Sequence, residues 1–546
     1  MTRTHVSAQL LAAMGDLLAG TRAATLDFDT PGAGQARETR DEVADQLSDY
    51  ILPRLVQLDA PLLTVVGGST GAGKSTLVSS IVGAPVTEAG VLRPTTRSPV
   101  LVHHPDDADW FVRERVLPDL PRHGDQDGSV TYGLRLVATD SIPRGLAILD
   151  APDVDSIDEV NRELATQLLA AADLWLFVTS AARYADQVPW SYLKRAADRS
   201  ASLAVVLDRT ADDAVEEVRG HLARMMTARG LADSPLFTVP ESILSHTGLL
   251  PSGAVAPIAG WLRDLAADPA ARRTVIGRTL DGAVRHAVFR AHDIADALDE
   301  QVAVAARLGR GVDEAYVAAR ADLPRQLSDG SVISGEVDAC WRTVSAGLGR
   351  AAAAPTAAVE GIDDLRRAVT ASVVSTMLAS AGRAAQAVGD AWAADAEGRR
   401  LLSSAADLDR ASNEVSRAAA ERVAAWVGTV EDWVRSTGSY EAAELDRLAA
   451  CTVVATVAGP DHVAGAAVRD LLQTVWGAER ATSLVTSSVD ELRVVAGEVL
   501  ALDRLRLEQL APSADTIAAQ QTNLRSAARA AEYARHADFV NGEIAP

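Results

Sequence analysis

Residues 62–75 read LLTVVGGSTGAGKS and decide the fold of this part of the chain. An apolar run is followed at once by a glycine-rich loop, and Gly68 to Ser75 fit the pattern G-x-x-x-x-G-K-[ST]. Glycines let the backbone of such a loop turn its N–H groups toward phosphates, and the N-terminus of the next helix adds positive potential. The stretch therefore predicts a strand, a phosphate-binding loop and a helix that begins near Lys74.

The pattern gives individual residues of the loop a role. Lys74 should reach the β- and γ-phosphates of a nucleotide, and the Ser75 hydroxyl should bind Mg²⁺. Lys74 and Lys194 are the only lysines among 52 basic residues, which supports a specific use of Lys74. The residues of the loop expected to bind the nucleotide are Gly68, Ser69, Thr70, Gly71, Ala72, Gly73, Lys74, Ser75 and Thr76.

The same letters contain a second pattern. Residues 67–71, GGSTG, also fit G-x-S-x-G, the nucleophile elbow of α/β-hydrolases, which likewise lies between a strand and a helix. Asp208 and His246 would then have to complete a catalytic triad. This alternative leaves Lys74 and Ser75 without a role, so the phosphate-binding loop is the favoured interpretation.

Short apolar runs alternate with helical patterns as far as about residue 265. These strand candidates are 62–66, 100–102, 147–149, 174–178, 203–207 and 236–239. Such alternation is typical of an α/β domain with a largely parallel sheet and helices on both faces. Residues 1–27 and 38–58 are expected to form amphipathic helices around a loop at 30–34.

Beyond about residue 266 the sequence shows only helical patterns and becomes richer in alanine. We therefore expect three parts: N-terminal helices in 1–59 that join the helical bundle, a P-loop domain in 60–265, and a long all-α neck and stalk in 266–546. The most apolar stretch of the helical region is 448–459, and a second short apolar segment follows at 462–468, so that the pair spans 448–468. It could form a tip that touches a membrane or a partner, and the favoured alternative is a pair of core helices.

Composition excludes several classes of protein. The chain has 546 residues and a formal charge of −22, which argues against a nucleic-acid partner held by phosphate contacts. Cys340 and Cys451 are too few for a disulfide framework or a zinc site. Neither the order of a signal peptide nor an uninterrupted run of ~18 apolar residues is found. We expect a cytoplasmic protein, with a peripheral position at the inner face of the cell membrane as a further option.

Two further motifs indicate the class of nucleotide-binding protein. Residues 147–152, AILDAP, predict a strand that ends in D-x-P and resemble the third motif of GTPases, in which Asp150 would hold Mg²⁺ through water. Residues 93–99, RPTTRSP, resemble a switch I segment whose threonine joins the Mg²⁺ shell when the γ-phosphate is bound. We favour Thr96 for this role, with Thr95 as the alternative. No glutamate follows Asp150 directly and no LSGGQ-like segment occurs, as a transporter-type ATPase would require.

Together these segments resemble a bacterial dynamin-like protein of the type found in high-GC Gram-positive bacteria. The resemblance covers roughly residues 60–240 and rests on GSTGAGKST, RPTTRSP and LDAPDVDS followed by DLWLFVTSAARYAD. It implies a GTP hydrolase with Mg²⁺ as cofactor and GTP as substrate, which couples self-assembly to membrane remodelling or septation. It also implies partners: a second copy in a GTPase-domain dimer or oligomer, a second dynamin-like protein, and a membrane surface.

Several positions depart from the pattern of that family. Asp153 replaces the glycine of D-x-P-G, whose N–H would meet the γ-phosphate, and it is itself expected to contact the nucleotide. Its backbone N–H remains, but its carboxylate would repel the phosphate. The base-reading motif [NT]-K-x-D is absent, and Asp208 and Arg209 after the strand at 203–207 are the candidates for contact with the base. Thr70 stands where dynamins commonly place a glutamine that orients water.

These departures affect the predicted chemistry. We expect slow or partner-dependent hydrolysis, with Lys74, Thr70 and Thr96 as the catalytic residues and Ser75, Thr96 and Asp150 as the metal ligands. Two alternatives stay open. One is a catalytically weak, nucleotide-dependent scaffold that works with a second dynamin-like protein, and the other is a P-loop ATPase.

Overall fold

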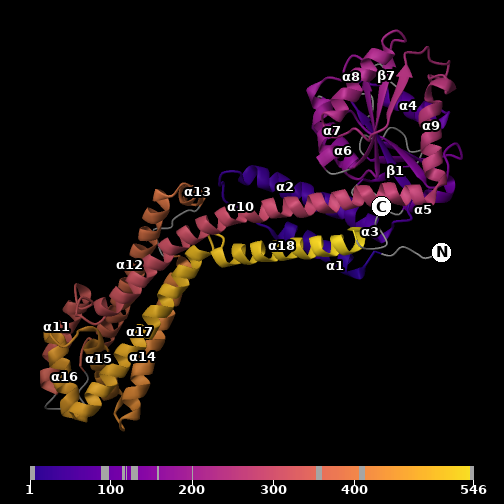
Figure 1. The fold of residues 1–546 in the computed structure, drawn as a ribbon. Coiled ribbons are helices and arrows are strands. Elements are labelled where there is room, and N and C mark those ends of the chain that lie inside the picture. Colours follow the sequence, from indigo (N-terminus) through magenta and orange to yellow (C-terminus); the bar gives the residue numbers. More distant parts are fainter. Residues whose placement is uncertain are drawn as a thin grey trace. The chain divides into compact units, whose positions relative to one another are not determined.

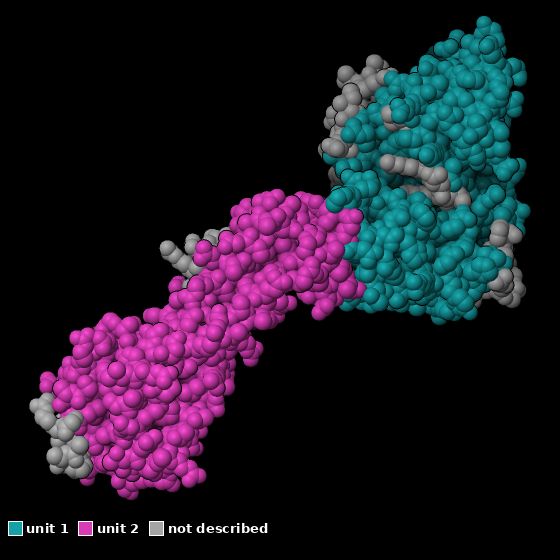
Figure 2. Space-filling model, turned by 60° about the vertical axis from the view of Figure 1, so that its left-hand side comes forward, with its two compact units in different colours: residues 1–26, 31–299, 519–546 teal, residues 27–30, 300–518 magenta. Residues whose placement is uncertain are grey.

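The computed structural model describes residues 6–87, 98–112, 117, 120–123, 133–156, 159–198, 201–351, 359–404 and 412–540. The chain divides into two compact units, which Figure 2 shows in different colours. Unit 1 comprises residues 1–26, 31–299 and 519–546, and unit 2 comprises residues 27–30 and 300–518. The helix α10 (Pro269–Gln326) contributes residues to both units.

An eight-stranded sheet forms the centre of the α/β part of unit 1 (Figure 1). Its order is β3-β4-β2-β5-β1-β6-β7-β8, and every neighbouring pair is parallel except β2 and β5. The strands are β1 (Leu62–Gly68), β2 (Val100–His103), β3 (Arg122–His123), β4 (Leu134–Ala138), β5 (Leu146–Asp150), β6 (Leu174–Ser180), β7 (Ser202–Thr210) and β8 (Leu236–Pro240). All six predicted strands are confirmed. The sequence analysis missed β3, which has two residues, and β4, which is half-buried.

Helices cover both faces of this sheet, as the predicted α/β class requires. On one face, α4 (Lys74–Val82) and α9 (Ser252–Ala267) pack against the strands. On the other face lie α6 (Glu159–Ala170), α7 (Gln187–Asp198) and α8 (Val215–Thr227). Strands buried on both faces read as continuous apolar runs, which explains the sequences of β1, β5 and β6. The connection after β2 contains a 3-10 turn (Pro105–Asp107) and α5 (Ala108–Val112).

The N-terminal helices belong to unit 1, the unit that also contains the sheet. They are α1 (Ala8–Ala23), α2 (Ala33–Gln46), a π-helical turn (Leu47–Ile51) and α3 (Leu52–Val56). Helix α1 lies against α18 (Ala514–Arg535), where Gly20 faces Leu524, and α18 is followed by a second π-helical turn (His536–Val540). Just after α1, the Thr25 hydroxyl donates to the side-chain oxygen of Gln520 over 2.8 Å. Arg525 of α18 pairs with Asp296 of α10 over 2.8 Å. The expected helix at 1–27 is shorter than predicted, and the expected helix at 38–58 begins earlier, at Ala33, which the sequence placed in a loop.

The regular secondary structure of unit 2 is helical throughout the residues that the structure describes, which confirms the expected all-α region. Besides the distal part of α10 they are α11 (Glu336–Ala351), α12 (Ile362–Ala394), α13 (Ala396–Ser404), α14 (Asn413–Ser436), α15 (Ala442–Val457), α16 (Val463–Trp476) and α17 (Ala478–Glu508). Two buried tryptophans link these helices through their indole N–H groups. Trp392 donates to the Leu308 carbonyl over 3.1 Å, and Trp426 donates to the Ser488 carbonyl over 3.2 Å.

The apolar stretch that the sequence offered as a tip lies mostly inside unit 2. Residues 448–458 of α15 and its C-cap are all buried. This position matches the alternative of core helices, although Val463 at the start of α16 is 83% exposed. Among the described residues, none of the helices combines the length and the apolar character needed to cross a bilayer.

Candidate nucleotide-binding site

The loop between β1 and α4 has the geometry of a phosphate-binding loop. Gly68 and Gly73 have φ angles of 147° and 93°, which residues with a side chain rarely adopt. A Cβ atom at Gly68 would lie 1.9 Å from the Val178 carbonyl oxygen, and one at Gly73 would lie 2.1 Å from an Asp208 carboxylate oxygen. The loop can therefore pass this close to β6 and β7 only with glycine at both positions.

Lys74 is buried at the first position of α4 and turns back into the loop. Its ammonium group donates to the carbonyl oxygens of Gly68 and Ser69, at 3.0 and 3.1 Å. It also forms an ion pair with the Asp153 carboxylate from the segment after β5. Two partners of the ammonium group thus lie in the loop itself, and the third lies in the segment after β5.

Thr70 is held by a residue that the sequence analysis did not single out. Its backbone N–H and its hydroxyl both donate to Asp155 Oδ1, at 2.5 and 2.7 Å. The other carboxylate oxygen of Asp155 accepts from Arg183, which follows β6, over 2.8 Å. The acidic run DVDS at 153–156 was the available signal for Asp155, while nothing local in the sequence marked Arg183.

Asp150 ends β5, directly opposite Val66 of β1 in the parallel ladder. Both of its carboxylate oxygens are buried and make no well-formed hydrogen bond within the described part of the chain. Burial raises the pKa of Asp150 to about 6, and the Ser75 hydroxyl and the Lys74 charge partly oppose that shift.

A buried carboxylate with unsatisfied oxygens, next to a hydroxyl group, is the kind of oxygen donor set that Mg²⁺ prefers. Asp150 and Ser75 therefore fit the predicted ion. The third predicted ligand, Thr96, and its alternative Thr95 lie outside the described residues. The described residues contain no group of three or more His, Cys, Asp or Glu side chains that could hold a metal by themselves.

Asp208 and Arg209 lie at the end of β7 beside the loop. Asp208 is 3% exposed, and its carboxylate accepts from the Arg209 N–H over 2.8 Å. Burial raises the pKa of Asp208 to about 6. Arg209 is exposed and has a φ of 53°, which is uncommon for a residue with a side chain. The Asp208 carboxylate therefore lies beside Gly73 of the loop, and contact of Asp208 or Arg209 with a base stays a prediction.

The hydrolase alternative does not fit this geometry. The Ser69 hydroxyl is buried and has no hydrogen-bond partner among the residues that the structure describes. A nucleophile elbow instead needs an exposed serine bonded to a histidine. The fold and the site define a P-loop nucleotide-binding domain joined to a helical region.

The sequence matches no protein-family model and no curated protein. Among solved structures, the chain is similar to a chain of an oligomerised bacterial dynamin pair described as sensing and tethering membranes, with a TM-score of 0.34 and 9% identity over 94% of this chain and 96% of that one. It is also similar to Toc33 from Arabidopsis thaliana in complex with GDP and Mg²⁺, with a TM-score of 0.25 and 14% identity over 46% and 96%. A third is Era from Aquifex aeolicus, solved with GDP and aluminium fluoride, with a TM-score of 0.23 and 17% identity over 33% and 50%.

Proposed function

We propose that this protein is a dynamin-like GTPase that binds and hydrolyses GTP with Mg²⁺. The observation that carries the proposal is the arrangement of Lys74, Ser75 and Asp150. A buried lysine folded into a glycine loop, next to a buried carboxylate with unsatisfied oxygens, suits a nucleotide phosphate with its magnesium ion. The D-x-P motif at Asp150 favours GTP over ATP.

Within this proposal each residue of the site has a task. The N–H groups of the loop and the Lys74 ammonium would bind the phosphates, and Ser75, Asp150 and Thr96 would hold Mg²⁺. The ion, when bound, would neutralise charge on the phosphate oxygens. Thr70 is too short to replace a glutamine, and its hydroxyl is already bonded to Asp155. We therefore propose slow turnover that a partner or a second copy of the chain accelerates.

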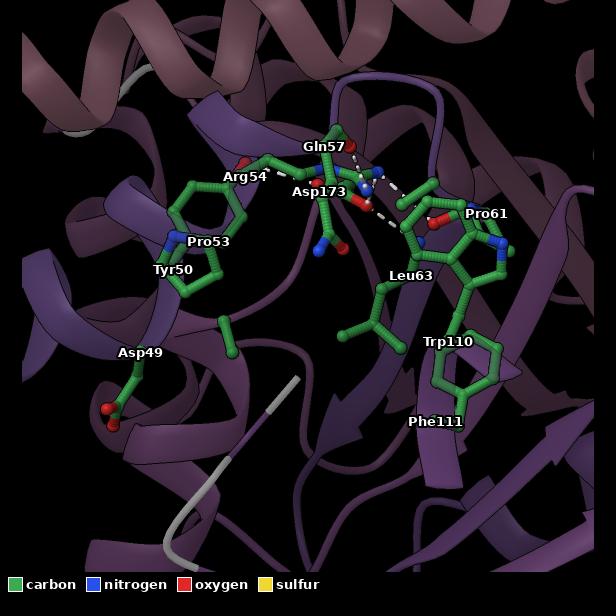
Figure 3. Close-up of a pocket in the computed structure, with 12 residues that line it drawn as sticks. Asp49, Tyr50, Pro53, Arg54, Gln57, Pro61, Leu63, Trp110, Phe111 and Asp173 are labelled. Atoms are coloured by element: carbon green, nitrogen blue, oxygen red, sulfur yellow. Dashed lines mark hydrogen bonds and ion pairs between the residues drawn. The ribbon is translucent and has the colours of Figure 1, made fainter. Parts of the chain in front are cut away.

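A buried polar cluster supports coupling between this site and the helices of unit 1. The Asp173 carboxylate, directly before β6, accepts from the Leu63 N–H of β1 over 2.7 Å and from Arg54 of α3 over 2.5 Å (Figure 3). The hydroxyl of Thr279 in α10 donates to the Asp173 carbonyl over 2.9 Å. The strand that ends in the phosphate-binding loop therefore shares one anchor with α3 and α10.

The same cluster borders a small cavity of about 30 Å³. Figure 3 shows Trp110, Leu63 and Gln57 around it. Arg54 Nε is buried there without a hydrogen-bond partner in the described part of the chain. The cavity is lined in part by polar side chains and is large enough for one water molecule, which would accept from Arg54 Nε.

We further propose that nucleotide binding acts on self-assembly, on a second dynamin-like protein and on a membrane surface, in membrane remodelling or septation. A catalytically weak scaffold is the second candidate, because Thr70 and Lys74 both bind acidic side chains of the same chain. Turnover that rises with protein concentration or with added liposomes would favour the GTPase. A flat, negligible rate with nucleotide binding intact would favour the scaffold.

The first experiment is a titration of the full chain with fluorescent GTP, GDP and ATP analogues in the presence of Mg²⁺. We expect GTP to compete better than ATP. Equal competition would leave the P-loop ATPase as the better description, and no binding of any nucleotide would refute the proposed function.

A further inference from the structure

The segment after β5 contacts two groups of the phosphate-binding loop that would otherwise be available to phosphates, the Lys74 ammonium and the Thr70 N–H. Asp153 pairs with the Lys74 ammonium, and Asp155 accepts the backbone N–H of Thr70 over 2.5 Å. Between them, the Val154 N–H donates to the Gly68 carbonyl over 3.3 Å. Three consecutive residues of one segment therefore bond to both ends of the same short loop.

The charge and burial of these contacts make them more than surface ion pairs. The side chains of Lys74 and Asp153 are 4% and 18% exposed, so water screens their attraction weakly. The second carboxylate oxygen of Asp155 accepts from Arg183 over 2.8 Å, and this ion pair orients the carboxylate toward Thr70. The Asp153 carboxylate binds the Lys74 ammonium, and the Asp155 carboxylate binds the Thr70 N–H. Both carboxylates are anionic oxygen acceptors, as phosphate oxygens are.

We propose that Asp153 and Asp155 form an acidic clamp that competes with the γ-phosphate of a bound nucleotide for Lys74 and for the Thr70 N–H. The clamp deepens the proposed GTPase function and rests on it. A triphosphate must displace the clamp, and the γ-phosphate then repels the Asp153 carboxylate, since like charges lie side by side. A diphosphate lacks that charge and leaves more of the clamp in place. The position at which a glycine is usual thereby becomes a sensor of the third phosphate.

The competition predicts that removing one charge tightens nucleotide binding. In the full chain, Asp153→Asn should lower the dissociation constant of a non-hydrolysable GTP analogue by about tenfold, as expected when roughly nine molecules in ten must first release the clamp. The dissociation constant of GDP should fall by a smaller factor. Asp155→Asn should act in the same direction, because a neutral amide oxygen accepts the Thr70 N–H more weakly than the carboxylate does.

Asp140→Asn is the matched control. Asp140 lies in the turn before β5, at the edge of the sheet opposite the phosphate-binding loop, and its side chain is 89% exposed. Its substitution removes the same charge from the chain and should leave both dissociation constants within about twofold. An Asp153→Asn variant that behaves like this control would overturn the clamp.

Hydrogen exchange of the unmodified chain tests the clamp without any substitution. The GTP analogue should speed exchange of the Val154 amide, since its bond to Gly68 breaks, and GDP should change it less. Unchanged or slower exchange with the GTP analogue would overturn the clamp even if the variants failed to fold.

The outcomes separate the clamp from the proposed function. If the unmodified chain binds nucleotides and Lys74→Ala does not, the proposed function stands, and the Asp153 and Val154 results decide the clamp alone. If the unmodified chain and all variants bind no nucleotide, both the proposed function and the clamp are refuted.

Discussion

Replacing Asp208 by asparagine should stabilise the protein at neutral pH. The carboxylate is 3% exposed, it lies against Gly73, and the Arg209 N–H is its only hydrogen-bond donor that the structure shows within the described residues. Asparagine has nearly the same shape and keeps an acceptor for that N–H. The substitution therefore removes a buried charge with little change in packing.

The pKa of Asp208 gives the size of the effect. Burial raises it from 3.8 to about 6, despite the opposing Arg209 N–H and charge. That difference corresponds to about 3 kcal/mol of preference for the protonated form in the folded state. Because the asparagine amide must also be desolvated, we expect Asp208→Asn to raise the free energy of unfolding by about 1–3 kcal/mol at neutral pH.

The pH dependence has a defined sign. The folded-state pKa lies above the unfolded one, so the folded state binds more protons between pH 3.8 and about 6. The contribution of Asp208 to stability is full below pH 3.8 and is lost as the pH rises through about 6. The advantage of the variant over the unmodified chain should therefore be largest above pH 6 and fade toward pH 4.

Urea unfolding followed by tryptophan fluorescence, at several pH values between about 4 and 8, measures this difference. Asp212→Asn is the control, since Asp212 is exposed in the segment after the same strand. A variant less stable than the unmodified chain at neutral pH, or an advantage that does not change with pH, would refute the assignment of a costly buried charge to Asp208.

Three further predictions concern the same unit. Lys74→Ala should weaken nucleotide binding by at least about a hundredfold in a fluorescence titration, because a charge-assisted contact to two phosphates is lost. Lys194→Ala is the control and should bind nucleotide normally, because Lys194 is an exposed residue of α7. Asp150→Asn should abolish the gain in nucleotide affinity that Mg²⁺ gives, and a gain as large as that of the unmodified chain would remove Asp150 from the metal site. Asp173→Asn should lower the free energy of unfolding by about 3–5 kcal/mol, because Arg54 is left as an uncompensated buried charge; a loss below about 1 kcal/mol would show that Arg54 stays solvated.

The sequence by itself determined the P-loop, the six main strands and the all-α region. These features follow from contiguous residues. A loop that binds phosphates through its own N–H groups needs its glycines and its lysine at fixed spacing, and a strand buried on both faces needs an unbroken apolar run. For the same reason Lys74, Ser75 and Asp150 could be assigned from short motifs, and the structure brings these three side chains to one end of the sheet.

Only the tertiary structure decided which partners these residues meet. Asp153 contacts Lys74 across 79 positions of sequence, and Asp155 contacts Thr70 across 85. The same holds for Asp208, which the sequence offered to a nucleotide base and the fold places against Gly73. Such contacts depend on the order of strands in the sheet, because β5 and β6 flank β1 although they follow it by about 80 residues or more. Short sequence patterns do not specify the order of strands in a sheet. The residues of the site could therefore be predicted from the sequence, whereas the contacts between them could not.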